Sequence, residues 1–181
     1  TSSTPTNWVR KSVTKMNYSE RSVESVLNEL KSLGTEQNLK IYRRHGISEE
    51  MYGVSYANQN KLAKEIKKAK RTDLAIPLWE TANHDARVLA TKLMTTDGLN
   101  QTVANQLVRG VCHSLTATGL AEVIARIDSA PVLAGKWISA SPKRSHWKVY
   151  TGWAVIASIA LDKKNHTEVK DDWFSPFIDQ I

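Results

Sequence analysis

A run of basic residues in the first half of the chain has the spacing of one helix face. It consists of Lys61, Lys64, Lys68 and Arg71. Three more cations, Lys40, Arg43 and Arg44, stand before it. Clustered ammonium and guanidinium groups bind phosphates, and such binding weakens with salt because it releases counterions. The pattern therefore predicts a polyanion-binding surface, with a solvated charged face as the alternative.

The charge is distributed unevenly along the chain. Residues 1–72 contain 14 Lys and Arg against 7 Asp and Glu, whereas residues 73–181 contain 11 of each type. The whole formal charge of +7 therefore lies in the first 72 residues. This asymmetry places the predicted polyanion-binding surface in the N-terminal part of the chain.

Residues of catalytic types elsewhere form no recognisable constellation. Cys112, His113 and Asp128 have the types needed for thiol chemistry. No nucleophile signature surrounds the cysteine, so we interpret it as a residue at a helix junction. His84 and Asp85 are interpreted as helix-start residues and not as an acid–base pair.

The sequence also argues against metal chemistry. A single cysteine excludes an intrachain disulfide and a thiolate zinc cage, and the five histidines lie far apart. We therefore expect neither a metal nor a cofactor. Arg87 is predicted to form an internal ion pair or a packing contact and not to bind phosphate directly.

Length and composition are those of a folded, water-soluble domain. The chain has 181 residues, of which 41% are hydrophobic and 24% charged. We expect residues 1–18 to be a tail with room for a short helix, and residues 19–181 to form one repeat domain. Because the chain has neither a long apolar run nor an apolar leader at its start, we expect a cytoplasmic location.

Apolar residues recur at helical spacing from end to end, which predicts an all-α fold. Gly34 is predicted to end the first helix in a left-handed conformation, and Gly46 to end the second. One further helix is expected through residues 120–127. The other predicted helices start at Ser19 or Ser22, Thr35, Ser55, Thr72, Asn83, Asn100, Pro131, Ser145 and Ser175.

Short helices joined by short connections favour antiparallel helix pairs stacked side by side. Such stacking gives an α-α superhelix, and a globular helical bundle is the alternative. No exact sequence repeat is visible, so the repeat prediction concerns helix pairs alone.

Three stretches resemble the DNA alkylation repair family of AlkD-like DNA glycosylases. The first combines residues 33–34 with Ile-Tyr-Arg-Arg-His-Gly-Ile at 41–47 and Tyr-Gly-Val at 52–54. The second is Leu-Trp-Glu-Thr-Ala-Asn-His-Asp-Ala-Arg at 78–87. The third joins Lys136 and Trp137 to Trp-Lys-Val-Tyr-Thr-Gly-Trp-Ala at 147–154. Together they span roughly residues 25 to 165.

The resemblance implies HEAT-like helix pairs whose concave basic surface holds duplex DNA. It also implies hydrolysis of the N-glycosidic bond of a 3- or 7-methylated purine. In that family an aspartate and two tryptophans face the sugar of the damaged nucleotide, where they stabilise the positive charge that develops as the bond breaks.

The sequence departs from the family at these positions. Ser114 stands where the family has a tryptophan, and Thr118 where it has the aspartate. Val149 and Tyr150 replace a pair of arginines, and the second tryptophan is expected on a repeat beyond Ile181. Because a neutral hydroxyl cannot offset a developing positive charge, we expect weak or absent excision. Glu122 and Asp128 are the nearby carboxylates that could act as substitutes.

The leading functional hypothesis is a monomeric protein that binds duplex, alkylated or distorted DNA through a basic concave face. One alternative is an active glycosylase for 3- and 7-methylpurines, and another is a helical scaffold for an acidic protein. We expect most tryptophans to be core residues, with one or two available to stack on bases. The expected DNA-binding residues are Lys40, Arg43, Arg44, Lys61, Lys64, Lys68, Arg71, Arg109 and Lys148.

Overall fold

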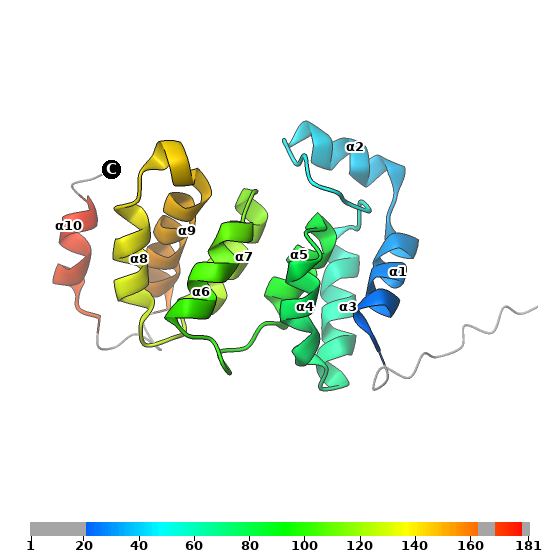
Figure 1. Cartoon of the computed structure of the whole chain (residues 1–181), viewed down its shortest axis with the longest axis horizontal. Helices are drawn as coiled ribbons and strands as arrows, with labels where there is room; N and C mark the ends of the chain where they lie inside the picture. The colour runs from blue at the N-terminus through cyan, green and yellow to red at the C-terminus, as the bar shows by residue number, and fades with distance from the viewer. Residues whose placement is uncertain (1–20, 163–168, 179–181) are drawn as a thin grey trace, which may run out of the picture.

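The chain folds as a row of short α-helices. The computed structural model describes residues 21–162 and 169–178, and the predicted tail over residues 1–18 lies outside these ranges. The helices follow one another along the long axis, from α1 (Val23–Leu33) at one end to α10 (Ser175–Ile178) at the other (Figure 1). Within the described part of the chain, the extended pairing is a single antiparallel bridge between Gly34 and Val54. The all-α prediction is therefore confirmed.

The remaining elements are short helices in both halves of the row. The N-terminal half adds α2 (Glu36–Arg44), α3 (Tyr56–Lys68), the 3₁₀ helix η2 (Thr72–Leu74), α4 (Ala75–Glu80) and α5 (His84–Leu93). The C-terminal half adds α6 (Gln101–Leu107), the 3₁₀ helix η3 (Val108–Gly110), α7 (Ser114–Ile124), α8 (Ala130–Ile138), α9 (Pro142–Leu161) and the 3₁₀ helix η4 (Asp171–Phe174).

Five helices begin at the polar capping residues that the sequence predicted. The N-caps of α1, α2, α3, α5 and α6 are Ser22, Thr35, Ser55, Asn83 and Asn100. Each side chain accepts a hydrogen bond from a backbone amide of the first turn. These amides have no carbonyl partner inside the helix, so the caps stabilise the helix starts.

Gly34 differs from the expected left-handed helix stop. Its backbone is extended, with φ −70° and ψ 149°, because it pairs with Val54 in the isolated bridge. A Cβ atom at this position would lie 2.0 Å from the carbonyl oxygen of Tyr52. The glycine is therefore required by the close approach of two backbone segments and not by its φ angle.

Two helix boundaries in the C-terminal half also differ from expectation. The helix predicted through residues 120–127 ends at Ile124, so Ile127 lies in the following connection. The helix predicted to open at Ser145 begins at Pro142, which fits the first turn of a helix. Ser145 instead marks a kink, with φ −145° and ψ 41° inside α9.

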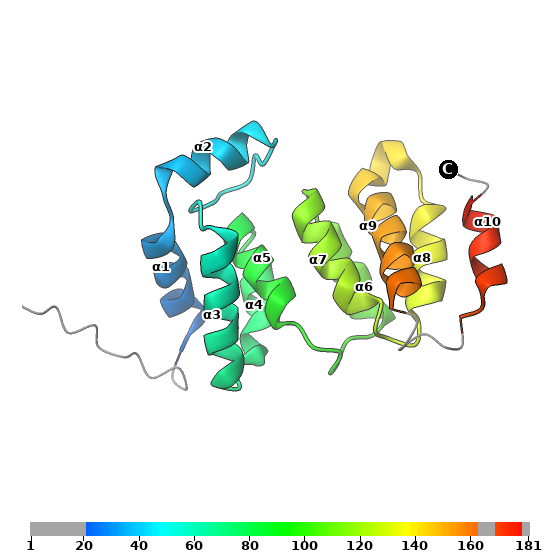
Figure 2. The same ribbon diagram turned by 180° about the vertical axis from the view of Figure 1, so that it is seen from behind.

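The helices pack in two rows. Contacts join α3 to α5, α5 to α7 and α7 to α9, and we call these four helices the central row. On the other side α4 packs on α5, and α8 packs on α9 (Figures 1 and 2). Pairs stacked in this way bury one face of each helix against the next pair.

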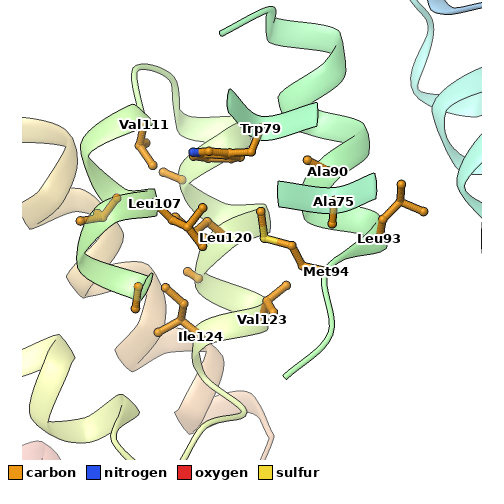
Figure 3. Packing of buried hydrophobic residues seen from close by; sticks show 14 of the residues in the cluster. Ala75, Trp79, Ala90, Leu93, Met94, Leu107, Val111, Leu120, Val123 and Ile124 are labelled. Carbon is orange, nitrogen blue, oxygen red and sulfur yellow. The ribbon is translucent and has the colours of Figure 1, made fainter. Parts of the chain in front are cut away.

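One continuous apolar core runs between the two rows. Figure 3 shows Trp79 of α4 lying near Leu107 and Val111, so this ring joins the α4–α5 pair to the α6–α7 region. Trp79 and Trp137 are core residues, whereas Trp147, Trp153 and Trp173 are half-buried at its edge. No helix in the described ranges has both the length and the apolarity that a bilayer crossing requires.

We predict that Gly34→Ala destabilises the domain by about 2–4 kcal/mol, because the added methyl group would force the α1–α2 junction away from Tyr52. Urea denaturation measures this loss. Gly135→Ala in α8 is the control, since an added Cβ meets nothing within 4 Å there. The control variant should be as stable as the parent chain or gain up to about 1 kcal/mol. Equal stability of the two variants would contradict the close-approach argument.

Candidate nucleic-acid interface

A buried carboxylate positions the loop that joins α2 to α3. The side chain of Asp85, in the first turn of α5, accepts hydrogen bonds from the backbone amides of Tyr52, Gly53 and Val54 at 2.6, 3.0 and 3.0 Å. Gln59 adds its amide at 3.3 Å. Backbone amides stabilise a buried carboxylate in place of water. Asp85 is the helix-start residue that the sequence predicted, and it also connects α5 to this loop.

A second acidic side chain, Glu49, lies at the centre of a polar cluster between α5 and the start of α7. One of its oxygens lies 3.2 Å from the guanidinium of Arg87, and the other lies 3.5 Å from Nδ1 of His84. The thiol of Cys112 donates to the same carboxylate. Arg87 also donates to the carbonyl of Trp79 at 3.2 Å. The internal ion pair predicted for Arg87 is therefore present.

The cluster sets the ionisation of its members. Burial opposes the ionisation of Glu49, but the bonds from His84 and Cys112 and the charge of Arg87 outweigh it and lower the pKa of Glu49. Burial and the neighbouring Glu49 carboxylate raise the pKa of Cys112 to about 12. A thiol with this pKa is protonated at neutral pH, and it donates to Glu49 where the connection to α7 begins.

A chain of rings links α2, α5, α7 and α9. The ring of His84 lies 5.9 Å from Tyr42 and 5.6 Å from His113, and His113 lies 6.2 Å from Trp147. Nε2 of His113 lies 3.4 Å from the carbonyl oxygen of His45, where the C-terminal end of α2 points towards α7 (Figures 1 and 2). The end of α2 therefore lies close to the start of α7.

The predicted cations divide into separate groups. The three α3 lysines that the sequence predicts as DNA-binding (Lys61, Lys64, Lys68) and the three α2 cations (Lys40, Arg43, Arg44) are exposed. Among the described residues, none of these six forms an ion pair with a carboxylate. Arg71 is different, because it lies beyond α3, pairs with Asp73 at 2.9 Å and donates to the carbonyl of Arg21 at 2.7 Å. Arg71 therefore does not extend the α3 lysine face.

Arg109 and Lys148, far apart in the sequence, meet at one pocket of about 280 Å³. Its lining residues are Val108, Arg109, Val111, Ser145, His146, Trp147 and Lys148. They come from η3, from the extended residue Val111 after it and from the kinked start of α9. The pocket combines two cations, an indole ring and an apolar wall, which is a composition suited to an anionic ligand with a flat apolar part.

Ser114 and Thr118, which the resemblance predicts at the tryptophan and aspartate positions, both lie on α7. Ser114 is the first residue of the helix and is half-buried, and Thr118 is exposed one turn later. The hydroxyl of Thr118 donates to the carbonyl of Ser114 at 2.9 Å. Glu122 is exposed one turn beyond Thr118, and Asp128 is exposed in the connection to α8. The two positions therefore present hydroxyls and no negative charge.

Sequence reasoning missed two features of this region. Glu49 gave no signal, because it lies in a turn and its partners are distant in the chain. The pocket was missed because η3 and the kink of α9 meet only in the folded molecule. Arg109 and Lys148 had been selected separately as DNA-binding residues, and the structure brings them together.

Comparison with known sequences gives a family match and two relatives. The sequence model described as DNA alkylation repair enzyme matches residues 26–117. An uncharacterized protein of Listeria innocua is 29% identical over 133 residues, and one of Listeria monocytogenes is 28% identical over the same length. Each alignment covers 68% of this chain and 58% of the relative, so the chain spans less than two thirds of these proteins.

A solved structure shares the fold with a TM-score of 0.75 and 22% sequence identity. The similarity covers 88% of this chain and 66% of the other chain. That protein is described as belonging to a new family related to the HEAT-like repeat DNA glycosylases, with affinity for branched DNA structures. The predicted HEAT-like helix pairs are therefore confirmed as the fold of this chain.

His113 should make stability depend on pH. Nδ1 of His113 accepts the amide hydrogen of Leu115 and caps α7, a role that needs the neutral ring. Burial lowers the pKa of His113, although the bond to the His45 carbonyl opposes this shift. The folded protein therefore binds fewer protons than the unfolded chain. The neutral His113 ring therefore contributes its full stabilisation of the fold above the unfolded pKa of about 6.5. This stabilisation is lost as the pH falls through the folded pKa.

Urea denaturation between pH 8 and pH 5 tests this prediction. The comparison is with His113→Asn, which keeps a side-chain acceptor at the cap but does not titrate. The stability advantage of the parent chain over this variant should shrink as the pH falls. Glu49 is protonated only at lower pH, because its pKa is lowered from 4.5. It is present in both proteins, so it does not contribute to the difference between them. A constant difference across the range would contradict a titrating cap.

Proposed function

Because this chain belongs to the DNA alkylation repair family, we propose that it binds duplex or distorted DNA and is weak or inactive in base excision. The observation that carries the proposal is the meeting of Arg109 and Lys148 at one pocket close to the start of α7. Two cations from distant segments form one place for phosphate groups. A cytoplasmic location is part of the same proposal.

The exposed lysines of α3 supply a further phosphate-binding surface. Lys61, Lys64 and Lys68 extend from a helix of the central row, whose other members carry Thr118 and Lys148. Contacts to phosphate groups position DNA without reading its sequence. The reported affinity of the solved neighbour for branched DNA supports DNA as the ligand class for this fold.

Weak excision follows from the chemistry of α7. Breaking the N-glycosidic bond leaves positive charge on the sugar, and an anion in the site stabilises that charge. Thr118 offers a neutral hydroxyl that already bonds within its own helix. The half-buried carboxylate of Glu49 is paired with Arg87 and lies next to His84, so its charge is already compensated.

Replacing Lys61, Lys64 and Lys68 of α3 together by glutamate should weaken binding to duplex DNA at least about tenfold. The slope of log affinity against log salt should also become shallower by roughly 2–3, since each lost phosphate contact removes about 0.9. Filter binding or gel shift across a salt series measures both quantities. The fold should survive, because these side chains are exposed.

A charge-matched control reverses Lys31, Arg126 and Lys136, which lie on α1, after α7 and on α8. It has the same net charge as the α3 variant and should retain most of the affinity. Equal losses in both variants would show that net charge, and not the α3 face, controls binding. If the parent chain binds an acidic protein but no DNA at any salt concentration, the scaffold alternative replaces the proposal.

Excision is tested by incubating methylated duplex DNA with the protein and measuring free 3- and 7-methylpurines. We expect release at the level of a protein-free control, because α7 has a neutral hydroxyl and not a carboxylate at Thr118. Release above that level would instead support the active-glycosylase alternative. In that event Glu122→Gln and Asp128→Asn identify the acting carboxylate, since loss of release in one of them assigns its role.

A further inference from the structure

The pocket between η3 and the kink of α9 is lined by groups that recognise different parts of a nucleotide. We propose that it binds one unpaired nucleotide of DNA, with the base on Trp147 and the flanking phosphates on Arg109 and Lys148. This inference rests on the proposed DNA binding and specifies the DNA structure that is preferred. The ligand class is duplex DNA that contains an unstacked nucleotide.

The charges of the pocket favour an anionic ligand. Arg109 is exposed at the pocket edge, and Lys148 is half-buried on α9. Among the described lining residues, none carries a carboxylate. Neither cation is paired with an acidic side chain in this part of the structure. Both are therefore available to contact phosphate oxygens.

The aromatic wall is held in a defined orientation. The ring centroid of Trp147 lies 5.0 Å from that of His146 and 5.6 Å from that of Tyr150, and both contacts are edge to face. His113 contacts the same indole from α7 at 6.2 Å. A ring restrained in this way loses little freedom when a base stacks on it, and every base has a face for stacking.

The size of the pocket favours a single nucleotide over a paired one. A volume of about 280 Å³ lies just below the range of about 300–1,000 Å³ for small-ligand sites. A base inside a duplex has both faces covered by its neighbours, so it cannot stack on Trp147. Unstacking costs least where pairing is already absent, as at a bulge or a branch point. Val108 and Val111 form the apolar part of the lining.

The test uses two duplexes of the same sequence, one of which carries a single bulged 2-aminopurine. The fluorescence of this base falls when it stacks on an aromatic ring. We expect the full chain to bind the bulged duplex at least about tenfold more tightly than the plain duplex, with quenching of the bulged base. Trp147→Leu should lose both the preference for the bulged duplex and the quenching.

Trp153→Leu is the matched control, because Trp153 is also half-buried on α9 but contacts Phe177 and does not line the pocket. It should retain both the preference and the quenching. Arg109→Gln changes an exposed side chain, so it tests the phosphate contact even if Trp147→Leu does not fold. It should weaken binding to the bulged duplex more than binding to the plain duplex.

Two results would overturn the inference while leaving the proposed function in place. One is equal affinity of the parent chain for the two duplexes, and the other is a bulge preference that survives both Trp147→Leu and Arg109→Gln. Absence of binding to either duplex is a distinct result, because it would overturn the proposed DNA binding and this inference together.

Discussion

Asp85 is almost completely buried in the first turn of α5, and its carboxylate accepts hydrogen bonds from three consecutive backbone amides at residues 52–54. A buried charge is stable only when dipoles replace the lost water, and here the backbone of the loop does so. The same loop pairs with Gly34 and accepts a hydrogen bond from Tyr42 at the Val54 carbonyl. The positions of α1, α2 and α3 relative to α5 therefore all depend on this carboxylate.

Several acidic side chains of the N-terminal half are engaged in internal contacts and do not lie beside the exposed lysines of α3. Asp85 accepts hydrogen bonds from backbone amides, and Glu49 pairs with Arg87 inside the molecule, so neither carboxylate lies beside the lysines of α3. Glu29 is likewise engaged with the buried Arg21. Cations that remain exposed are then free to meet a polyanion. Thr118 itself carries no negative charge, and its hydroxyl donates to the carbonyl of Ser114 within α7.

Much of the helical framework could be predicted because its signals are local. The caps at Ser22, Thr35, Ser55, Asn83 and Asn100 act within one turn of their own helix, so the sequence shows them directly. Errors arose where a distant segment decides the local geometry. Gly34 is extended because Val54 and Tyr52 approach it, and neither contact has a signature in the residues around the glycine.

The sequence by itself determined the all-α class, the family and the hydroxyl groups at Ser114 and Thr118, since these depend on residue type and periodicity. Tertiary structure alone decided which cations lie close together. It brings Arg71 to the carbonyl of Arg21 and Arg109 to the pocket that Lys148 lines. The physical reason is that charge and stacking act over a few ångströms of space, whereas separation along the chain carries no information about that distance until the helices have packed.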